Sequence, residues 1–193
     1  MILAALLAAY AFPAWPLVPA DVLSLREGQH LHKDFEDGAL RGSIIRFFVR
    51  TDLHRVYGFL ADVPAMPRYM PHLREIRVVA QREGVKVLEY KSQVPLVADF
   101  TLERHFEPPR RIWWTKVKAP YKRIEGAWDL FPAPGGTVVS YSLAVETGSL
   151  IPNWMAAEFQ KQGGSALVRN VTRHVESGGK WTRPDYPQEQ TPN

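Results

Sequence analysis

The stretch that decides the fold is residues 110–145, which read RRIWWTKVKAPYKRIEGAWDLFPAPGGTVVSYSLAV. It holds three runs rich in β-branched and aromatic residues, and the turn residues 119–120 and 132–136 separate these runs. Runs of this kind between turn residues are typical of β-hairpins. We therefore expect an antiparallel meander with strands over residues 111–118, 121–131 and 137–145.

Apolar and polar residues alternate in the second and third of these strands. Ile124 and Trp128 share one face of the second strand, whereas Glu125 and Asp129 share the other. A sheet with this pattern has one covered face and one face open to water. The long helical candidate left to cover it is Asn153–Glu176.

The preceding part of the chain supplies further strands and two short helices. A strand is expected over residues 39–50, and the next residues have apolar side chains at helical spacing, from Leu53 to Leu60. Prolines at positions 64, 67 and 71 break the following segment into short turns. Further strands are expected over residues 74–80, 85–94 and 98–106.

This order of elements predicts an α+β fold. We expect a curved antiparallel β-sheet wrapped around a long C-terminal helix (a helix-grip fold), with two short helices after the first main strand. A curved sheet closed by one helix leaves a cavity between them, and such cavities bind apolar small molecules.

The 193 residues suffice for one domain with tails. We expect an export signal or anchor over residues 1–20 and an N-terminal extension with edge strands, including residues 23–26, over residues 21–38. Residues 39–177 should form the ligand-binding domain. Residues 178–193 are rich in Pro and Gln from position 180 on, and we expect a disordered tail there.

Residues 1–20 carry no charge, and their apolar run 2–11 has the length of a signal-peptide core. Small residues near Ala11 and Ala20 would suit a signal peptidase. No basic residue precedes the run, and three prolines oppose a continuous membrane-spanning helix. Three alternatives remain for this segment. A cleaved signal would make the protein periplasmic or secreted, and an uncleaved anchor would attach it to a membrane. A buried or disordered tail would leave the protein in the cytoplasm.

Composition narrows the function classes. The net charge of +4 and the sequence pI near 9.4 favour anionic partners such as phospholipid surfaces. We do not expect nucleic acid, because dense Lys/Arg runs and recognised motifs are absent. The lack of Cys excludes disulfides, thiol catalysis and Cys-ligated zinc. His30 and His32 could face a metal together, but no third ligand is near in sequence, so two exposed histidines are favoured and no metal or cofactor is expected.

Two adjacent residues could carry chemistry, although recognisable catalytic motifs are absent from the sequence. Arg104 should share the covered face with the apolar residues of its strand, where a cation must be paired or must meet a polar group of a ligand. Arg104 could have a partner inside the protein, either in an ion pair with Glu89 or Glu103 or in a contact with Gln93. Alternatively, it could contact a ligand. His105 should take the opposite face, as a surface histidine or as a general base.

Trp113 and Trp114 are adjacent in a strand, so they should point to opposite faces, and one should lie outside. An outward Trp beside basic residues would suit an anionic membrane surface or a protein partner. The alternative is a solvated basic hairpin. The basic residues in question are Lys116, Lys118, Lys122 and Arg123.

Three stretches carry a family resemblance. The first is residues 48–62 with its continuation 66–73, the second is residues 126–130 with 135–141, and the third is the closing helix after residues 151–154. Through them, residues 39–176 resemble the START-like (SRPBCC) superfamily of polyketide cyclases/dehydrases, lipid-transfer proteins and coenzyme Q-binding START proteins. The resemblance implies the helix-grip fold and a hydrophobic small-molecule ligand, such as a lipid, a quinone or a polyketide-like chain.

We therefore expect a non-catalytic binder or carrier; the alternatives are a polyketide cyclase/dehydratase that uses Arg104, Tyr90 or His105, and a scaffold whose cavity is filled core. The Gly163-Gly164 pair marks a place where the closing helix bends or approaches the sheet. The candidate cavity residues come from the sheet and from this helix. They are Tyr90, Phe100, Leu102, Arg104, Trp128, Tyr141, Met155, Phe159 and Gly163.

Overall fold

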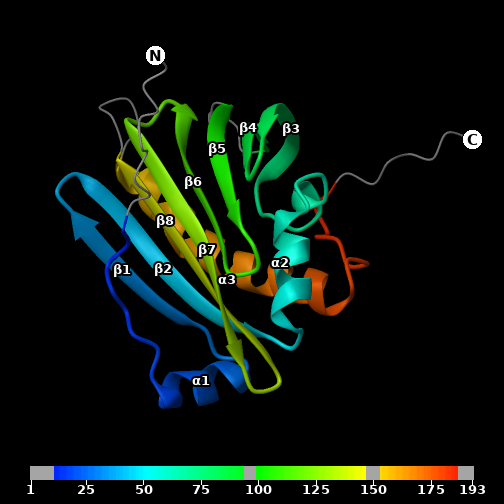
Figure 1. Ribbon diagram of the computed structural model, residues 1–193. Coiled ribbons are helices and arrows are strands. Elements are labelled where there is room, and N and C mark those ends of the chain that lie inside the picture. Colours follow the sequence, from blue (N-terminus) through cyan, green and yellow to red (C-terminus); the bar gives the residue numbers. More distant parts are fainter. Residues whose placement is uncertain (1–10, 94–98, 147–152, 187–193) are drawn as a thin grey trace, which may run out of the picture.

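The computed structural model describes residues 11–93, 99–146 and 153–186, with side chains of the last range from Gly164 on. Within these ranges the chain forms one antiparallel sheet of eight strands that curves around helices α2 and α3, while helix α1 lies outside the curve (Figure 1). The strands are β1 (Leu31–Asp37), β2 (Leu40–Val49), β3 (Leu73–Arg82), β4 (Val85–Ser92), β5 (Phe100–Glu107), β6 (Arg111–Lys118), β7 (Arg123–Ala133) and β8 (Gly136–Glu146). The helices are α1 (Pro19–Arg26), α2 (Leu53–Ala61) and α3 (Asn153–Glu176), with a 3₁₀ helix η1 (Met66–Arg68).

The predicted meander is confirmed as β6, β7 and β8, which pair in sequence order. The strand order across the sheet is β1-β2-β8-β7-β6-β5-β4-β3. Strand β2 pairs with β8, the last strand, because α2 and η1 carry the chain across the concave face before β3 begins. The two short helices predicted after the first main strand are therefore α2 and η1.

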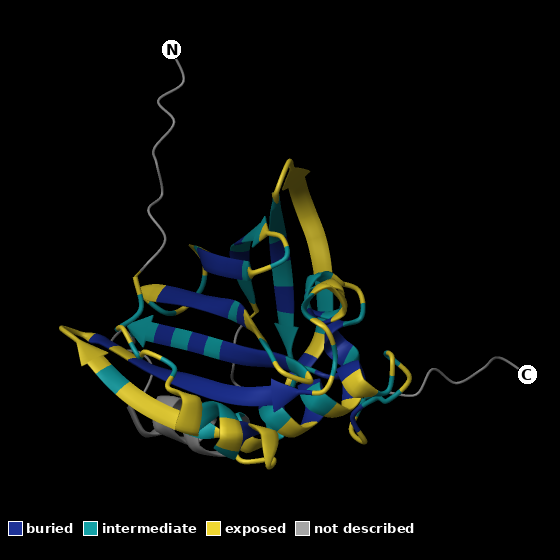
Figure 2. Ribbon diagram, turned by 60° about the horizontal axis from the view of Figure 1, so that its bottom comes forward, coloured by how far each residue is buried: buried dark blue, intermediate teal, exposed yellow. Residues whose placement is uncertain are grey.

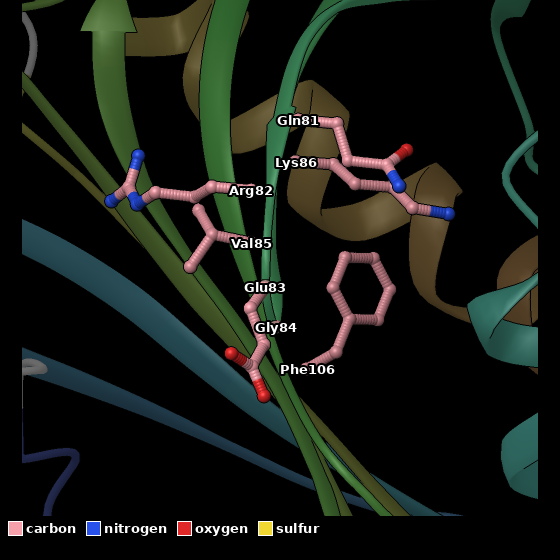
Figure 3. Close-up of a pocket in the computed structure, with 7 residues that line it drawn as sticks. All are labelled: Gln81, Arg82, Glu83, Gly84, Val85, Lys86 and Phe106. Atoms are coloured by element: carbon pink, nitrogen blue, oxygen red, sulfur yellow. The ribbon is translucent and has the colours of Figure 1, made fainter.

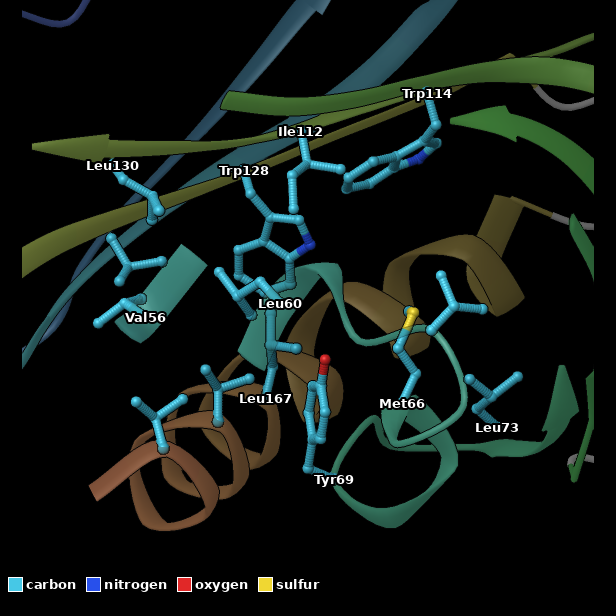
Figure 4. Packing of buried hydrophobic residues seen from close by; sticks show 14 of the residues in the cluster. Val56, Leu60, Met66, Tyr69, Leu73, Ile112, Trp114, Trp128, Leu130 and Leu167 are labelled. Carbon is cyan, nitrogen blue, oxygen red and sulfur yellow. The ribbon is translucent and has the colours of Figure 1, made fainter. Parts of the chain in front are cut away.

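The concave face of the sheet holds the main core. Helices α2 and α3 cover it, so that Leu60 of α2 and Leu167 of α3 pack in one cluster with Trp128 of β7 (Figure 4). Phe47 of β2 belongs to the same cluster.

Strand β2 is buried along nearly its whole length, whereas the edge strands β1 and β3 are mostly exposed (Figure 2). The alternation in residues 121–145 predicted the face that packs against the helices, where Trp128 and Leu130 are buried. The expectation that the other face is open to water is wrong, because Glu125 and Ser142 on that face are buried as well.

The strand predicted over residues 23–26 is wrong, because these residues end helix α1. Pro19 begins this helix, where its missing N–H costs nothing, and Asp21 accepts a hydrogen bond from the backbone of Val18. Leu25 is buried against Phe48 and Val138 on the convex face of the sheet. The second expected edge strand is confirmed as β1.

The segment before α1 also packs on the convex face. The guanidinium of Arg46 lies 4.4 Å from the ring centroid of Trp15, and it donates a hydrogen bond to the Trp15 carbonyl. The apolar run 2–11 lies outside the described residues except for Ala11, so the export signal stays a prediction. None of the helices in the described ranges combines the length and hydropathy needed to span a membrane.

The disorder predicted from residue 178 on is wrong as far as Tyr186. The side chain of Arg183 is fully buried and donates to the carbonyls of Pro67 at 2.8 Å and Leu73 at 2.7 Å. Trp181 packs on the main core. Composition did not predict that residues 180–186 are ordered, because the side chains of Trp181 and Arg183 alone hold this segment on the domain. Residues 187–193 lie outside the described part of the chain.

Candidate functional site

Arg104 is the polar centre of the concave face. It lies on β5 with only 2% of its surface exposed, and its side chain points toward the helices together with Leu102. Its Nη1 donates to the sulfur of Met66 at 2.8 Å, and its guanidinium carbon lies 4.9 Å from the ring centroid of Trp114. The hydroxyl of Tyr90 also lies close enough to Arg104 for the positive charge to act on the pKa of this phenol.

Gly126 leaves room for the indole ring of Trp114, which faces the Arg104 guanidinium. Gly126 of β7 pairs with Trp114 of β6, and a Cβ atom at position 126 would lie 2.2 Å from the indole ring. Such a distance is far inside van der Waals contact, so the ring occupies the space that any larger residue would need. The missing side chain lets Trp114 lie over β7 and present its ring face to Arg104.

The ion pair expected inside the fold is not formed. Glu103, one of the predicted partners, lies on the convex face at 3.0 Å from both Arg82 and His105. Among the residues described here, no carboxylate lies within 4.0 Å of Arg104, and its Nε has no hydrogen-bond partner. The site therefore contains a buried cation held by a thioether, an indole face and a phenol.

Three phenols surround the cation. Burial raises the pKa of Tyr69, Tyr90 and Tyr141 above the ordinary value for tyrosine, while the positive charge of Arg104 acts on each in the opposite direction. The net shift is upward, so all three hydroxyls stay protonated at neutral pH. The Tyr69 hydroxyl donates to the Phe59 carbonyl at 3.3 Å. The site thus offers N–H and O–H donors to an oxygen atom.

The structure brings six of the nine predicted cavity residues together on the concave face. Tyr90 stacks on Phe100 with ring centroids 4.9 Å apart, and Trp128 lies 4.5 Å from Tyr141 by the same measure. Leu102 and Arg104 complete this group. The side chains of the other three, Met155, Phe159 and Gly163, lie outside the described residues.

The close approach expected at the glycine pair of the closing helix is seen at Gly164. A Cβ atom there would lie 3.0 Å from Cδ1 of Ile45 on β2. Met66 and Tyr69 also contact the site, although the sequence did not predict them there. Prolines interrupt the segment around η1, so no periodicity was available to assign these side chains to a face.

His105 and Trp113 lie on the convex face, opposite the site. Their rings stack with centroids 3.6 Å apart, and Trp113 Nε1 donates to Glu107 at 2.6 Å. Burial lowers the pKa of His105. His105 is therefore not placed to act as a base on a ligand of the concave face.

Trp113 and Trp114 point to opposite faces of the sheet, as predicted, but the stacking on His105 leaves Trp113 only 8% exposed. The expectation of an exposed Trp in the basic hairpin is therefore wrong. Lys122 lies 3.7 Å from Glu146, and Arg123 pairs with Glu125. The aromatic anchor of the expected membrane patch is thus missing, while membrane contact itself stays a prediction.

Among the hollows at the surface of the described residues, two lie beside connections between strands. One, of about 560 Å³, lies where the β2–α2, β5–β6 and β7–β8 connections meet, beside Arg50, His54 and Arg110. The other, of about 460 Å³, lies at the β3–β4 turn and includes Phe106 (Figure 3). Within the described ranges, no group of three acidic or imidazole side chains is arranged to hold a metal ion.

The sequence pattern of the family described as polyketide cyclase/dehydrase and lipid transport matches residues 49–172. No curated protein matches the sequence. The matched range begins at the end of β2 and includes η1, Arg104 and the three phenols around it, those of Tyr69, Tyr90 and Tyr141.

Several solved structures share the fold. A STAR-related lipid transfer protein from Xanthomonas axonopodis is 17% identical with a TM-score of 0.62, covering 76% of this chain and 92% of that one. A protein from Thermus thermophilus is 16% identical with the same TM-score, covering 71% and 98%. The Zhui aromatase/cyclase from Streptomyces sp. R1128 is 17% identical with a TM-score of 0.57, covering 72% and 98%. At these identities the likeness concerns the fold alone.

Proposed function

Because this chain belongs to the polyketide cyclase/dehydrase and lipid transport family, we propose that it binds a hydrophobic small molecule on its concave face, with Arg104 as the polar contact. The observation that carries the proposal is the buried guanidinium with no carboxylate beside it among the described residues. Burying an ion costs several kcal/mol unless its hydrogen bonds are satisfied. A ligand oxygen at the unpaired Nε would remove part of that cost.

The walls around Arg104 suit a ligand that is mostly apolar. Phe100, Trp114 and Trp128 supply aromatic surface, and the protonated phenols of Tyr90 and Tyr141 supply donors near the cation. Pockets for such ligands are lined by apolar side chains with a few placed polar groups. A lipid, a quinone or a polyketide-like chain that carries a carbonyl or hydroxyl oxygen has the matching chemistry.

Native mass spectrometry of the purified protein, followed by titration with two apolar fluorescent probes, tests this proposal. One probe carries a ketone and the other is the matching hydrocarbon. We expect Arg104→Met to weaken binding of the ketone roughly tenfold, as expected for the loss of one hydrogen bond to a charged group, while the hydrocarbon binds as before. A wild-type protein that binds neither probe contradicts the proposal.

A second candidate function is catalysis of polyketide cyclisation or dehydration. The observation that favours it is the same cation with its phenols, because donors held in a dry site stabilise a developing enolate oxygen. In that case Arg104→Met should lower turnover of a poly-β-ketone substrate roughly 10²–10³-fold with little change in binding. The base proposed from the sequence, His105, faces away from this site, so binding is the function that the geometry supports best.

We also propose that the protein is exported and that cleavage occurs near Ala11 rather than Ala20. Trp15 covers Arg46, and Leu17 packs beside Leu25 on the convex face, so cleavage at Ala20 would remove part of the folded domain. Intact mass measurement of protein from a periplasmic fraction would locate the new N-terminus. Uncleaved protein found only in the cytosol contradicts this proposal.

A further inference from the structure

The hollow at the β3–β4 turn borders the concave face. It is lined in part by Gln81, Lys86 and Phe106, whose side chains point to one side of the hairpin, whereas Arg82 and Val85 point to the other (Figure 3). Its volume of about 460 Å³ lies within the range of small-molecule sites.

Strand pairing brings Lys86 next to the candidate site. Lys86 of β4 is the partner of Arg104 in β5, and directly opposed residues of an antiparallel pair have side chains on the same face. The Nζ of Lys86 lies 5.3 Å from the ring centroid of Phe106, and Phe106 also packs against the main core. An ammonium group and an aromatic surface therefore lie together at the rim.

The charges at this rim are unbalanced. Like charges directly opposite each other destabilise a sheet, yet Lys86 and Arg104 are cross-strand partners. Within the described part of the chain, neither cation lies within 4.0 Å of a carboxylate. Glu103 pairs with Arg82 on the convex face, and the carboxylate of Glu83 points away from Lys86 in the turn (Figure 3). An anion on this face would relieve the repulsion.

We propose that Lys86, with Gln81 and Phe106, forms a carboxylate-binding subsite at the rim of the concave face. The inference rests on the proposed binding function and narrows it: the ligand is an amphipathic acid. Its apolar part lies against Phe106 and the aromatic residues of the concave face, and its ionised carboxylate is bound by the ammonium of Lys86. Gln81, which pairs with Lys86 across β3 and β4, supplies an amide donor beside it.

A matched pair of probes tests this subsite. An anthroyloxy-labelled long-chain fatty acid and its methyl ester are titrated into the full-length protein at about pH 8, where a carboxylic acid is ionised. We expect the wild type to prefer the acid, and Lys86→Met to lower the ratio of acid to ester affinity about tenfold. Lys91→Met serves as the control, because Lys91 is on the same strand but pairs with Glu75 at 3.1 Å. Its ratio should equal that of the wild type.

The outcomes separate this inference from the binding function. If the ester binds but the wild type has no preference for the acid, or if Lys86→Met keeps the preference, the subsite is wrong while apolar binding stands. If Lys91→Met lowers the ratio as much as Lys86→Met, the preference reflects net charge and the subsite is wrong. If neither probe binds, the binding function and the subsite are both wrong.

Discussion

Arg46, Arg104 and Arg183 are buried among the described residues, and two of them, Arg183 and Arg104, lie in different regions and differ in how they are paired. Arg183, in residues 180–186, is fully buried and directs three of its nitrogens at the carbonyls of Pro67 and Leu73 and at the carboxylate of Asp185. Arg104, on the concave face, is 2% exposed and meets a sulfur, a phenol and an indole face, with one nitrogen unpaired.

The difference in hydrogen bonding distinguishes an arginine that stabilises the fold from one that is available to a ligand. A buried charge that serves the fold has its hydrogen bonds satisfied within the fold, because each unsatisfied group costs about 1–3 kcal/mol. Arg183 meets this condition and fixes the C-terminal segment to the loop around η1. Arg104 does not, so its position is explained better by a ligand than by stability. Four predictions test this contrast.

The largest effect is expected at Arg183. Arg183→Met should lower the free energy of unfolding by about 3–5 kcal/mol, because it leaves two buried carbonyls without donors. Urea unfolding measures the loss. Arg169→Met, at an exposed position of α3, is the control and should change stability by less than about 0.5 kcal/mol. A loss of under about 1 kcal/mol at Arg183 would remove the distinction between the two arginines.

The next effect concerns the indole beside Arg104. Gly126→Ala should cost about 1–3 kcal/mol, because its new methyl group would overlap the ring of Trp114. The near-ultraviolet circular dichroism of the protein should change with it. Gly58→Ala in α2 is a matched control, since no atom apart from its chain neighbours and the surrounding backbone of α2 lies within 4 Å of its new methyl group. That variant should gain up to about 1 kcal/mol from helix propensity. Equal changes of stability and circular dichroism in the two variants would show that the position of the Trp114 ring does not depend on Gly126.

A smaller change in stability is expected at Arg104 itself. Methionine has a similar length and no charge, and replacing buried ions by apolar side chains is often neutral or stabilising. Arg104→Met should therefore keep the free energy of unfolding within about 1 kcal/mol of the wild type while it alters ligand preference. A loss comparable to that of Arg183→Met would make Arg104 a structural residue and contradict both functional proposals for it.

The sequence predicted the face on which Arg104 lies, but it did not predict the partners of either arginine. Alternation along β5 decides the face of each side chain, so Arg104 and His105 were separated correctly. The contacts of Arg104 with Met66, and of Arg183 with Pro67, join segments far apart in the chain. A proline-broken turn and a polar tail have no periodicity, so local pattern could not place them.

The smallest expected effect is a pH dependence of stability that arises near the C-terminal segment and not around Arg104. His174 of α3 stacks on Tyr69 with ring centroids 4.6 Å apart, and its Nδ1 lies 2.7 Å from the Trp181 carbonyl. Burial lowers its pKa below the ordinary value of 6.5, with Arg68 acting in the same direction and Asp62 against it. The neutral imidazole therefore stabilises the fold above about pH 6.5, and this contribution is lost as the pH falls through the lower folded pKa.

The slope that results cannot exceed about 1.4 kcal/mol per pH unit. Melting temperatures measured from about pH 8 to about pH 5 should fall below about pH 6.5 in the wild type, and less steeply in His174→Gln. Arg104→Met should keep the wild-type slope, because the raised pKa values of Tyr69, Tyr90 and Tyr141 keep the phenols around Arg104 from titrating in this window. If Arg104→Met flattens the slope instead, the two regions are coupled through Tyr69, which touches both His174 and the surroundings of Arg104, and the contrast between a structural and a ligand-binding arginine would have to be given up.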